Sequence, residues 1–269
     1  MMLRQIWAFL LRDYQTEVSY RLSFLMSFVG VFFSSFVFYF ISQLLGDSVS
    51  PILAAYGGDY FSFVIIGIAF GGYFGLGLNG FARALRQAQT TGTLEALMMT
   101  PTSVSGIIIG SAAWSYAFTT FRVLIYLLLG TVILGLRFTS ANYLAALVAL
   151  VLSIVSFASI GIIAASVIMI IKRGDPVTGL FGSMANLVGG IYYPVEILPG
   201  WLQSIANLLP ITYALRAMRL ALLTGASWSA LAPDLLALLL FCVLLFPLSL
   251  VAFRYAVERA RKEGSLAHY

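Results

Sequence analysis

The stretch NYLAALVALVLSIVSFASIGIIAASVIMII, residues 142–171, carries no charged side chain. About 20 apolar residues are enough for a helix to cross the hydrocarbon core of a bilayer, so this stretch predicts a transmembrane helix. Five further stretches meet the same requirement, and they are residues 22–45, 60–81, 105–135, 176–195 and 231–253. The sequence therefore predicts an all-α polytopic membrane protein with six transmembrane helices.

The overall composition supports a membrane protein. Of the 269 residues, 61% are apolar and only 9% are charged, whereas a soluble domain has about 45–50% apolar and about 25% charged residues. So few charged side chains cannot cover a soluble surface of this size. This excludes a soluble enzyme, a disordered chain and a nucleic-acid-binding domain, even though the formal net charge is +5.

The sequence lacks the motifs of common catalytic sites. Neither lysine, Lys172 or Lys262, follows a glycine-rich run of the form GxxxxGKS or GxxxxGKT, so no loop is available to cradle the phosphates of ATP. The single histidine, His268, and the single cysteine, Cys242, are too few for a Ser-His triad, a His-ligated metal site or an intrachain disulfide. We expect no catalytic residue, metal or cofactor in this chain.

The basic residues indicate how the spans are oriented. Three of them, Arg137, Arg216 and Arg219, fall on one side of the expected spans, and Arg122 falls within the third span. The other side carries Arg4, Arg12, Arg21, Arg83, Arg86, Lys172, Arg173, Arg254, Arg259, Arg261 and Lys262. Because cytoplasmic loops carry the excess of Lys and Arg, we expect both termini to be cytoplasmic in a multi-pass protein of the cell membrane.

The two ends of the chain flank the spans. In residues 1–21, apolar side chains recur at spacings of three and four, which predicts an amphipathic helix in the cytoplasmic interface. These side chains are Leu3, Ile6, Trp7, Leu10, Tyr14 and Val18. We expect residues 22–256 to form one six-span domain and residues 257–269 to form a charged cytoplasmic tail.

Two connections between spans are long enough to hold structure of their own. In the loop 82–103, Gly92 and Pro101 bound a short helix near residues 92–99. In the segment 194–225, Pro199 and Pro210 separate two helical pieces of roughly ten to fifteen residues, each too short to span. We expect re-entrant or interfacial helices in this second segment.

Both connections resemble one known family. GTLEALMMTP, residues 92–101, resembles the cytoplasmic loop motif of the ABC-2 type transporter permeases. YPVEILPGWLQSIANLLPITYALRAMR, residues 193–219, resembles the signature that precedes their last span. The resemblance implies six spans, an N-terminal interfacial helix, a coupling helix between spans two and three, and re-entrant helices between spans five and six.

The resemblance also implies partners and a cargo. Permeases of this family work as dimers, either of one chain or of two different ones, with two copies of a separate ATPase subunit that binds ATP and Mg. They export amphipathic small molecules, drugs or lipids, and a lipid-linked polysaccharide is the alternative cargo. A secondary transporter driven by an ion gradient is the rival class, but it usually has repeated halves and ionisable residues at the membrane midplane.

The candidate site residues fall into two groups. Contact with the ATPase is expected from the short helix, where Gly92 permits a turn and Glu95 can meet a basic residue of the ATPase; the full set is Gly92, Thr93, Leu94, Glu95, Leu97 and Met98. The alternative for Glu95 is that it only complements the dipole of its helix. The candidates for the translocation path or outer gate are Asn186, Tyr192, Tyr193, Pro194, Glu196, Pro199, Trp201, Arg216 and Arg219.

Several of these polar residues also have a purely structural interpretation. Arg216 and Arg219 share one helix face and either meet lipid headgroups and anionic cargo, or snorkel and pair with Glu196. Arg122 either lines the pathway or is buried within the bundle. The glycines Gly67, Gly71 and Gly75 recur every fourth residue, which favours close helix packing over a flexing gate.

Overall fold

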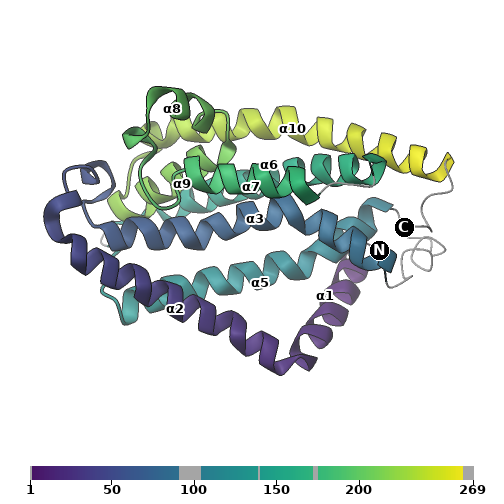
Figure 1. Cartoon of the computed structure of the whole chain (residues 1–269), viewed down its shortest axis with the longest axis horizontal. Helices are drawn as coiled ribbons and strands as arrows, with labels where there is room; N and C mark the ends of the chain where they lie inside the picture. The colour runs from purple at the N-terminus through teal and green to yellow at the C-terminus, as the bar shows by residue number, and fades with distance from the viewer. Residues whose placement is uncertain (1, 91–103, 139, 172–174, 263–269) are drawn as a thin grey trace.

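A computed structural model describes residues 2–90, 104–138, 140–171 and 175–262. Within these ranges the chain is almost entirely helical and contains no strand. The main helices are α1 (Met2–Ser19), α2 (Arg21–Leu45), α3 (Tyr60–Thr90), α5 (Val104–Val132), α6 (Tyr143–Ile171), α7 (Asp175–Val188), α8 (Gly200–Ala206), α9 (Pro210–Arg219) and α10 (Trp228–Lys262). The long helices form an elongated bundle (Figure 1).

Five helices of the described residues are long and apolar enough to cross a membrane. Their candidate spans are Phe24–Val49, Tyr60–Arg83, Ala112–Val132, Tyr143–Ile170 and Trp228–Arg259. The long apolar stretch around Arg122, expected as one span, is indeed the single helix α5. An all-α polytopic membrane fold is therefore present.

The expected span 176–195 is not one continuous helix. Helix α7 has 14 residues and ends at Val188, because the chain turns at Gly190, whose φ of +84° is one that residues with a Cβ rarely adopt. A helix of this length is shorter than the roughly 20 residues that cross the hydrocarbon core. The count of six spans stays a prediction.

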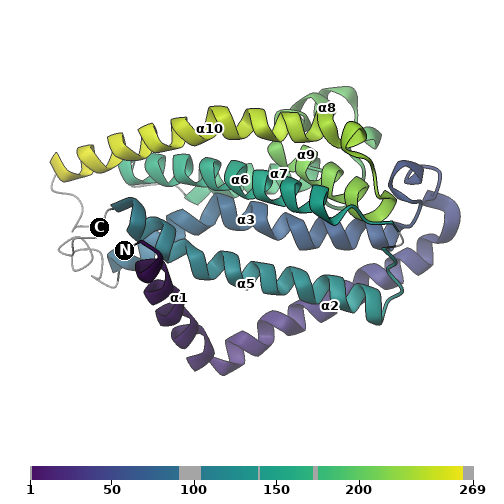
Figure 2. The ribbon, with the colours of Figure 1, turned by 180° about the vertical axis from the view of Figure 1, so that it is seen from behind.

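The core of the bundle lies where α6 packs against α3 and α10. These two pairs are the most extensive helix contacts, followed by α3 with α5, and α6 runs beside α10 in both views (Figure 2). The buried cluster includes Phe74 and Phe157, whose rings meet edge to face with centroids 5.3 Å apart. Many large apolar side chains on the outside of α2, α5 and α10 remain exposed, as expected for surfaces that face lipid.

The two ends of the bundle differ. At one end, called here the α8 end, lie α8, the connection 46–59 and the first turns of α10 (Figure 1). At the opposite end, called the termini end, lie the start of α1 and the last turns of α10. The basic residues of α10 fall at the termini end, whereas Arg216 and Arg219 fall at the α8 end.

Helix α1 runs at an angle to the long helices and rests on α5 (Figure 1). Phe9, which is buried, packs against Gly110, and the Tyr14 ring meets the Trp114 ring with centroids 5.4 Å apart. Trp7 is 66% exposed. The contact with α5 therefore includes Phe9, which lies outside the apolar set expected from the sequence.

Candidate functional site

Helix α9 carries the site and lies at the α8 end of the bundle. Pro210 is at its first position, where the missing N–H costs nothing and the fixed φ suits a helix. The helix packs against α3, α6 and α10, and most of its residues are buried. Its last turn holds Arg216 and Arg219, which point to different neighbours.

Arg219 is buried at 3% exposure and clamps three backbone carbonyls. Its Nε donates to Phe63 O at 3.0 Å, its Nη1 to Gly190 O at 2.7 Å, and its Nη2 to Ile191 O at 2.9 Å. The guanidinium also lies over the Phe63 ring, 3.4 Å from its centroid. Arg219 thus joins α9 to α3 and to the turn that follows α7.

A glycine on α3 makes this approach possible. A Cβ on Gly67 would lie 2.1 Å from Ile191 O and 2.4 Å from Arg219 Nη2. Gly71, one turn along, has the Ile191 side chain 3.0 Å from its Cβ position, whereas Gly75 has nothing within 4 Å. Two of the three regularly spaced glycines therefore serve packing, and the third faces open space.

Burial works against the charge of Arg219. It lowers the pKa of the guanidinium to about 9, and the negative charge of Glu196 opposes part of this shift. The side chain is therefore still a cation at neutral pH. Three carbonyl acceptors and the face of an aromatic ring compensate for the loss of water.

Arg216 forms an ion pair with Asp234 of α10. Its Nε lies 2.8 Å from Asp234 Oδ1, and its Nη2 donates to the same oxygen. The Asp234 side chain is only 4% exposed, whereas that of Arg216 is 35% exposed. The hydrogen bond raises the pKa of Arg216. Its ion-pair partner is thus Asp234, not Glu196.

Tyr56 links the connection 46–59 to the segment after α7. Its hydroxyl donates to Glu196 Oε1 at 3.1 Å. The Tyr56 ring is 6% exposed and meets Phe63 edge to face, with centroids 5.2 Å apart. Burial raises the pKa of Tyr56 well above its ordinary value, so the hydroxyl keeps its proton and acts as a donor.

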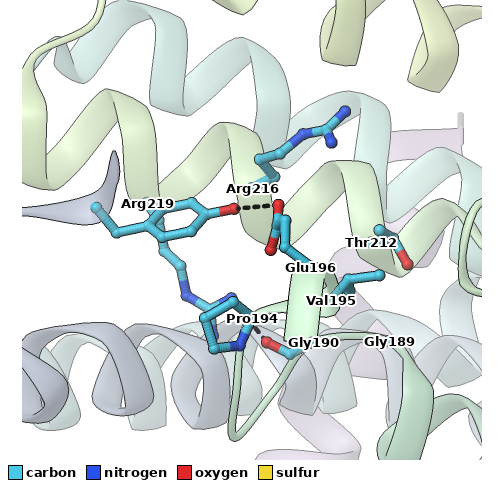
Figure 3. A pocket seen from close by; sticks show the side chains of 9 residues that line it. Gly189, Gly190, Pro194, Val195, Glu196, Thr212, Arg216 and Arg219 are labelled. Atoms are coloured by element: carbon cyan, nitrogen blue, oxygen red, sulfur yellow. Dashed lines mark hydrogen bonds between the residues drawn. The ribbon is translucent and has the colours of Figure 1, made fainter. Parts of the chain in front are cut away.

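Tyr56, Glu196, Arg216, Arg219 and Asp234 are called here the arginine cluster. All of them except Asp234 line a small cavity. In Figure 3 the two guanidinium groups point away from each other, and Glu196 lies between them. The space that a water molecule could occupy is about 10 Å³, close to the minimum for one water. The cavity is therefore closed to any larger molecule.

The remaining candidate gate residues lie around this cluster. Pro194 lines the cavity, and Tyr192, 41% exposed, stacks on Phe38 of α2 with centroids 5.7 Å apart. Tyr193 donates to Leu187 O. Asn186 is exposed on α7 and has no hydrogen bond to another described residue.

Helix α8 follows directly from a proline, as expected. Pro199 is its N-cap and Trp201, in its first turn, is 67% exposed. The helix has 7 residues, fewer than the ten or more expected, because the chain leaves helix at Asn207 before α9 begins at Pro210. The two prolines therefore mark both helix starts correctly, while the length of the first piece is wrong.

The candidate coupling residues lie outside the described residues. Gly92, Thr93, Leu94, Glu95, Leu97 and Met98 all fall within 91–103. Helix α3 leads into this stretch and continues to Thr90, beyond the expected end of its span at residue 81.

Three members of the site were not predicted from the sequence. Asp234, Tyr56 and Phe63 lie on segments that no motif marked. The one available signal was Asp234 itself, an acidic residue in the otherwise apolar start of the last span. A buried carboxylate is costly unless a basic side chain pairs with it, and Arg216 is the side chain that does so.

The comparison with protein families matches the pattern of the ABC-2 type transporter to residues 4–223. The chain belongs to the ABC-2 type transporter family. The matched range contains both sequence motifs and every member of the arginine cluster except Asp234. A comparison with curated proteins finds no match. As a member of this family, the chain is the permease component of an ABC transporter.

Proposed function

We propose that this permease is the membrane-spanning subunit of an ATP-driven exporter. Its membership of the ABC-2 type transporter family carries the proposal. The sequence has no phosphate-binding loop, so ATP and Mg would be bound by a separate ATPase subunit, present in two copies. A second permease chain would complete the transporter, as a homodimer or a heterodimer.

The cargo is an amphipathic small molecule, a drug or a lipid, moved out across the cell membrane. The exposed apolar faces of α2, α5 and α10 support contact with lipids along the whole bundle. A lipid-linked polysaccharide is the second candidate. A gradient-driven carrier is less well supported, because Asp234 and Glu196, the acids of the arginine cluster, lie at the end of the bundle and already have partners.

The α8 end would face the outside and the termini end the cytoplasm. The basic residues of α1 and of the end of α10 favour this orientation. The α8 end then forms the outer gate, with α8 and α9 as the proposed re-entrant helices. The cavity at this end has room for about one water molecule, so we expect cargo release there to require the arginine cluster to rearrange.

Affinity capture of the intact complex tests the assembly. A tagged permease extracted in mild detergent should co-purify with one kind of P-loop ATPase. Native mass spectrometry of the complex should show two permease chains and two ATPase chains. ATP hydrolysis by the purified permease with no second polypeptide would contradict the proposal.

A further inference from the structure

Arg122 is the central residue of the candidate span Ala112–Val132 on α5. A charge at this depth is costly unless it faces protein, water or an anion. Its side chain is only partly buried, and its Nε is fully buried.

No hydrogen bond or ion pair joins Arg122 to another residue of the described chain, and its Nε has no acceptor. The hydroxyl groups of Thr120 and Tyr126, within four residues of Arg122 on α5, already have partners. Tyr73 donates to Thr120 Oγ1 at 2.7 Å, and Ser34 Oγ lies 2.9 Å from the Tyr126 hydroxyl. Among the described residues, α5 carries three buried polar atoms without a hydrogen bond: Trp114 Nε1, the Tyr116 hydroxyl and Arg122 Nε.

Arg122 lies between two contacts that α5 makes with α2. One turn toward the termini end, Phe118 meets Phe28 with ring centroids 5.9 Å apart. One turn toward the α8 end, Tyr126 meets Ser34. Because residues four apart share a helix face, Arg122 belongs to the same α2-facing stripe.

A second unpaired donor lies on this stripe. Trp114 is two turns from Arg122 toward the termini end, and its buried indole Nε1 also has no hydrogen-bond partner. Its ring packs against Phe118 and Tyr14, with centroids 6.1 Å and 5.4 Å apart. The stripe thus offers two free N–H donors, one of them cationic, set among aromatic rings.

The chain cannot supply the missing anion from a second copy of itself. None of its ten acidic residues lies near the centre of a candidate span. They are Asp13, Glu17, Asp47, Asp59, Glu95, Asp175, Glu196, Asp234, Glu258 and Glu263. In a homodimer, no acidic side chain of the second copy therefore lies at the depth of Arg122.

We infer that Arg122 binds the anionic head group, a phosphate or a carboxylate, of an amphiphile held between α2 and α5. The apolar tail lies against Phe28, Phe118 and Phe121. A resident lipid keeps its head group at the interface, about 15 Å from the midplane, so the depth of Arg122 favours an amphiphile in transit. This last step rests on the proposed export function.

Binding to the full-length permease in nanodiscs of uncharged or zwitterionic lipid tests the inference. The probes are a fluorescent alkyl phosphate and the same alkyl chain ending in a hydroxyl. The wild type should bind the phosphate at least about tenfold more tightly. Arg122→Gln should abolish that preference, and Arg122→Lys should keep most of it.

Equal affinity of the wild type for the two probes would overturn the inference, whether or not any variant folds. So would a full phosphate preference in a folded Arg122→Gln protein. Adding phosphatidylglycerol to the nanodiscs distinguishes a site for a resident membrane lipid from a site for cargo in transit. At a resident lipid site phosphatidylglycerol should displace the alkyl phosphate probe, whereas at a transit site it should not. If the preference holds but ATP does not move the phosphate probe in the assembled complex, the export proposal fails and the binding site stands.

Discussion

Arg216 Nε lies 2.8 Å from Asp234 Oδ1, so the last turn of α9 is tied to the start of α10 by an ion pair. The acid is almost fully buried, while the base reaches the surface. The neighbouring Arg219 ties the same turn to α3 and to the segment after α7. The two arginines therefore hold α9 from both sides.

Removing one partner of this pair should destabilise the protein. Arg216→Met leaves the Asp234 carboxylate buried without a counter-charge and should lower the free energy of unfolding by about 3–5 kcal/mol. Thermal unfolding in detergent measures the loss. Arg137→Met is the matched control, because Arg137 is exposed and should change stability by no more than about 0.5 kcal/mol.

The double variant Arg216→Met with Asp234→Leu tests whether the lost stability comes from the unpaired carboxylate. Removing both charges takes away the uncompensated carboxylate and should restore most of the lost stability. If Arg216→Met is as stable as Arg137→Met, the ion pair does not hold α9 to α10.

The close approach at Gly67 gives a second prediction. Gly67→Ala places a methyl group against Ile191 O and Arg219 Nη2, and should cost about 1–3 kcal/mol of stability. Transport should fall with it, since the clash displaces the carbonyl clamp. Gly75→Ala on the same helix meets nothing within 4 Å, and should be neutral or slightly stabilising. Equal unfolding temperatures for the two variants would show that the clamp tolerates displacement.

Cysteine labelling tests the orientation of the bundle. Ser48 and Ser227 are exposed at the α8 end, so cysteines there should react with an impermeant thiol reagent added to intact cells. Cys242 is replaced first, and a cysteine at Thr90, the end of α3, should react only after the membrane is opened. Labelling of a cysteine at position 90 in intact cells would contradict the proposed topology.

Glu95 tests the coupling helix. If it forms a buried ion pair with the ATPase, Glu95→Gln should cost about 2–5 kcal/mol of association free energy. Complementing a helix dipole is worth only about 0.3–1 kcal/mol. Surface plasmon resonance of permease and ATPase distinguishes the two values. A variant that binds the ATPase and transports like wild type would assign Glu95 to the helix dipole alone.

Hydropathy was sufficient to predict most of the bundle, because crossing a bilayer requires long apolar helices and little else. The stretch 142–171 is α6 to within one residue, and Pro199 and Pro210 mark the starts of α8 and α9. The same reasoning failed at residues 189–190, where two glycines sit inside an apolar run. Hydropathy does not register the backbone conformation that ends α7 there.

The arginine cluster was only half predictable. Arg216 and Arg219 stood out as charges in an apolar segment, and their spacing put them on one helix face. Their partners depend on tertiary packing: Tyr56 meets Glu196 across 140 positions of sequence, and Arg219 binds carbonyl groups that every residue has. No side-chain motif reports contacts of this kind.

ATP-dependent movement of an amphiphile tests the central claim most directly. The permease and its co-purified ATPase are placed in proteoliposomes, and movement of the fluorescent alkyl phosphate across the bilayer is followed with ATP and Mg. Transport should require ATP and should stop when the phosphate-loop lysine of the ATPase is replaced. Transport that survives this replacement and follows an imposed proton or sodium gradient would contradict an ATP-driven exporter.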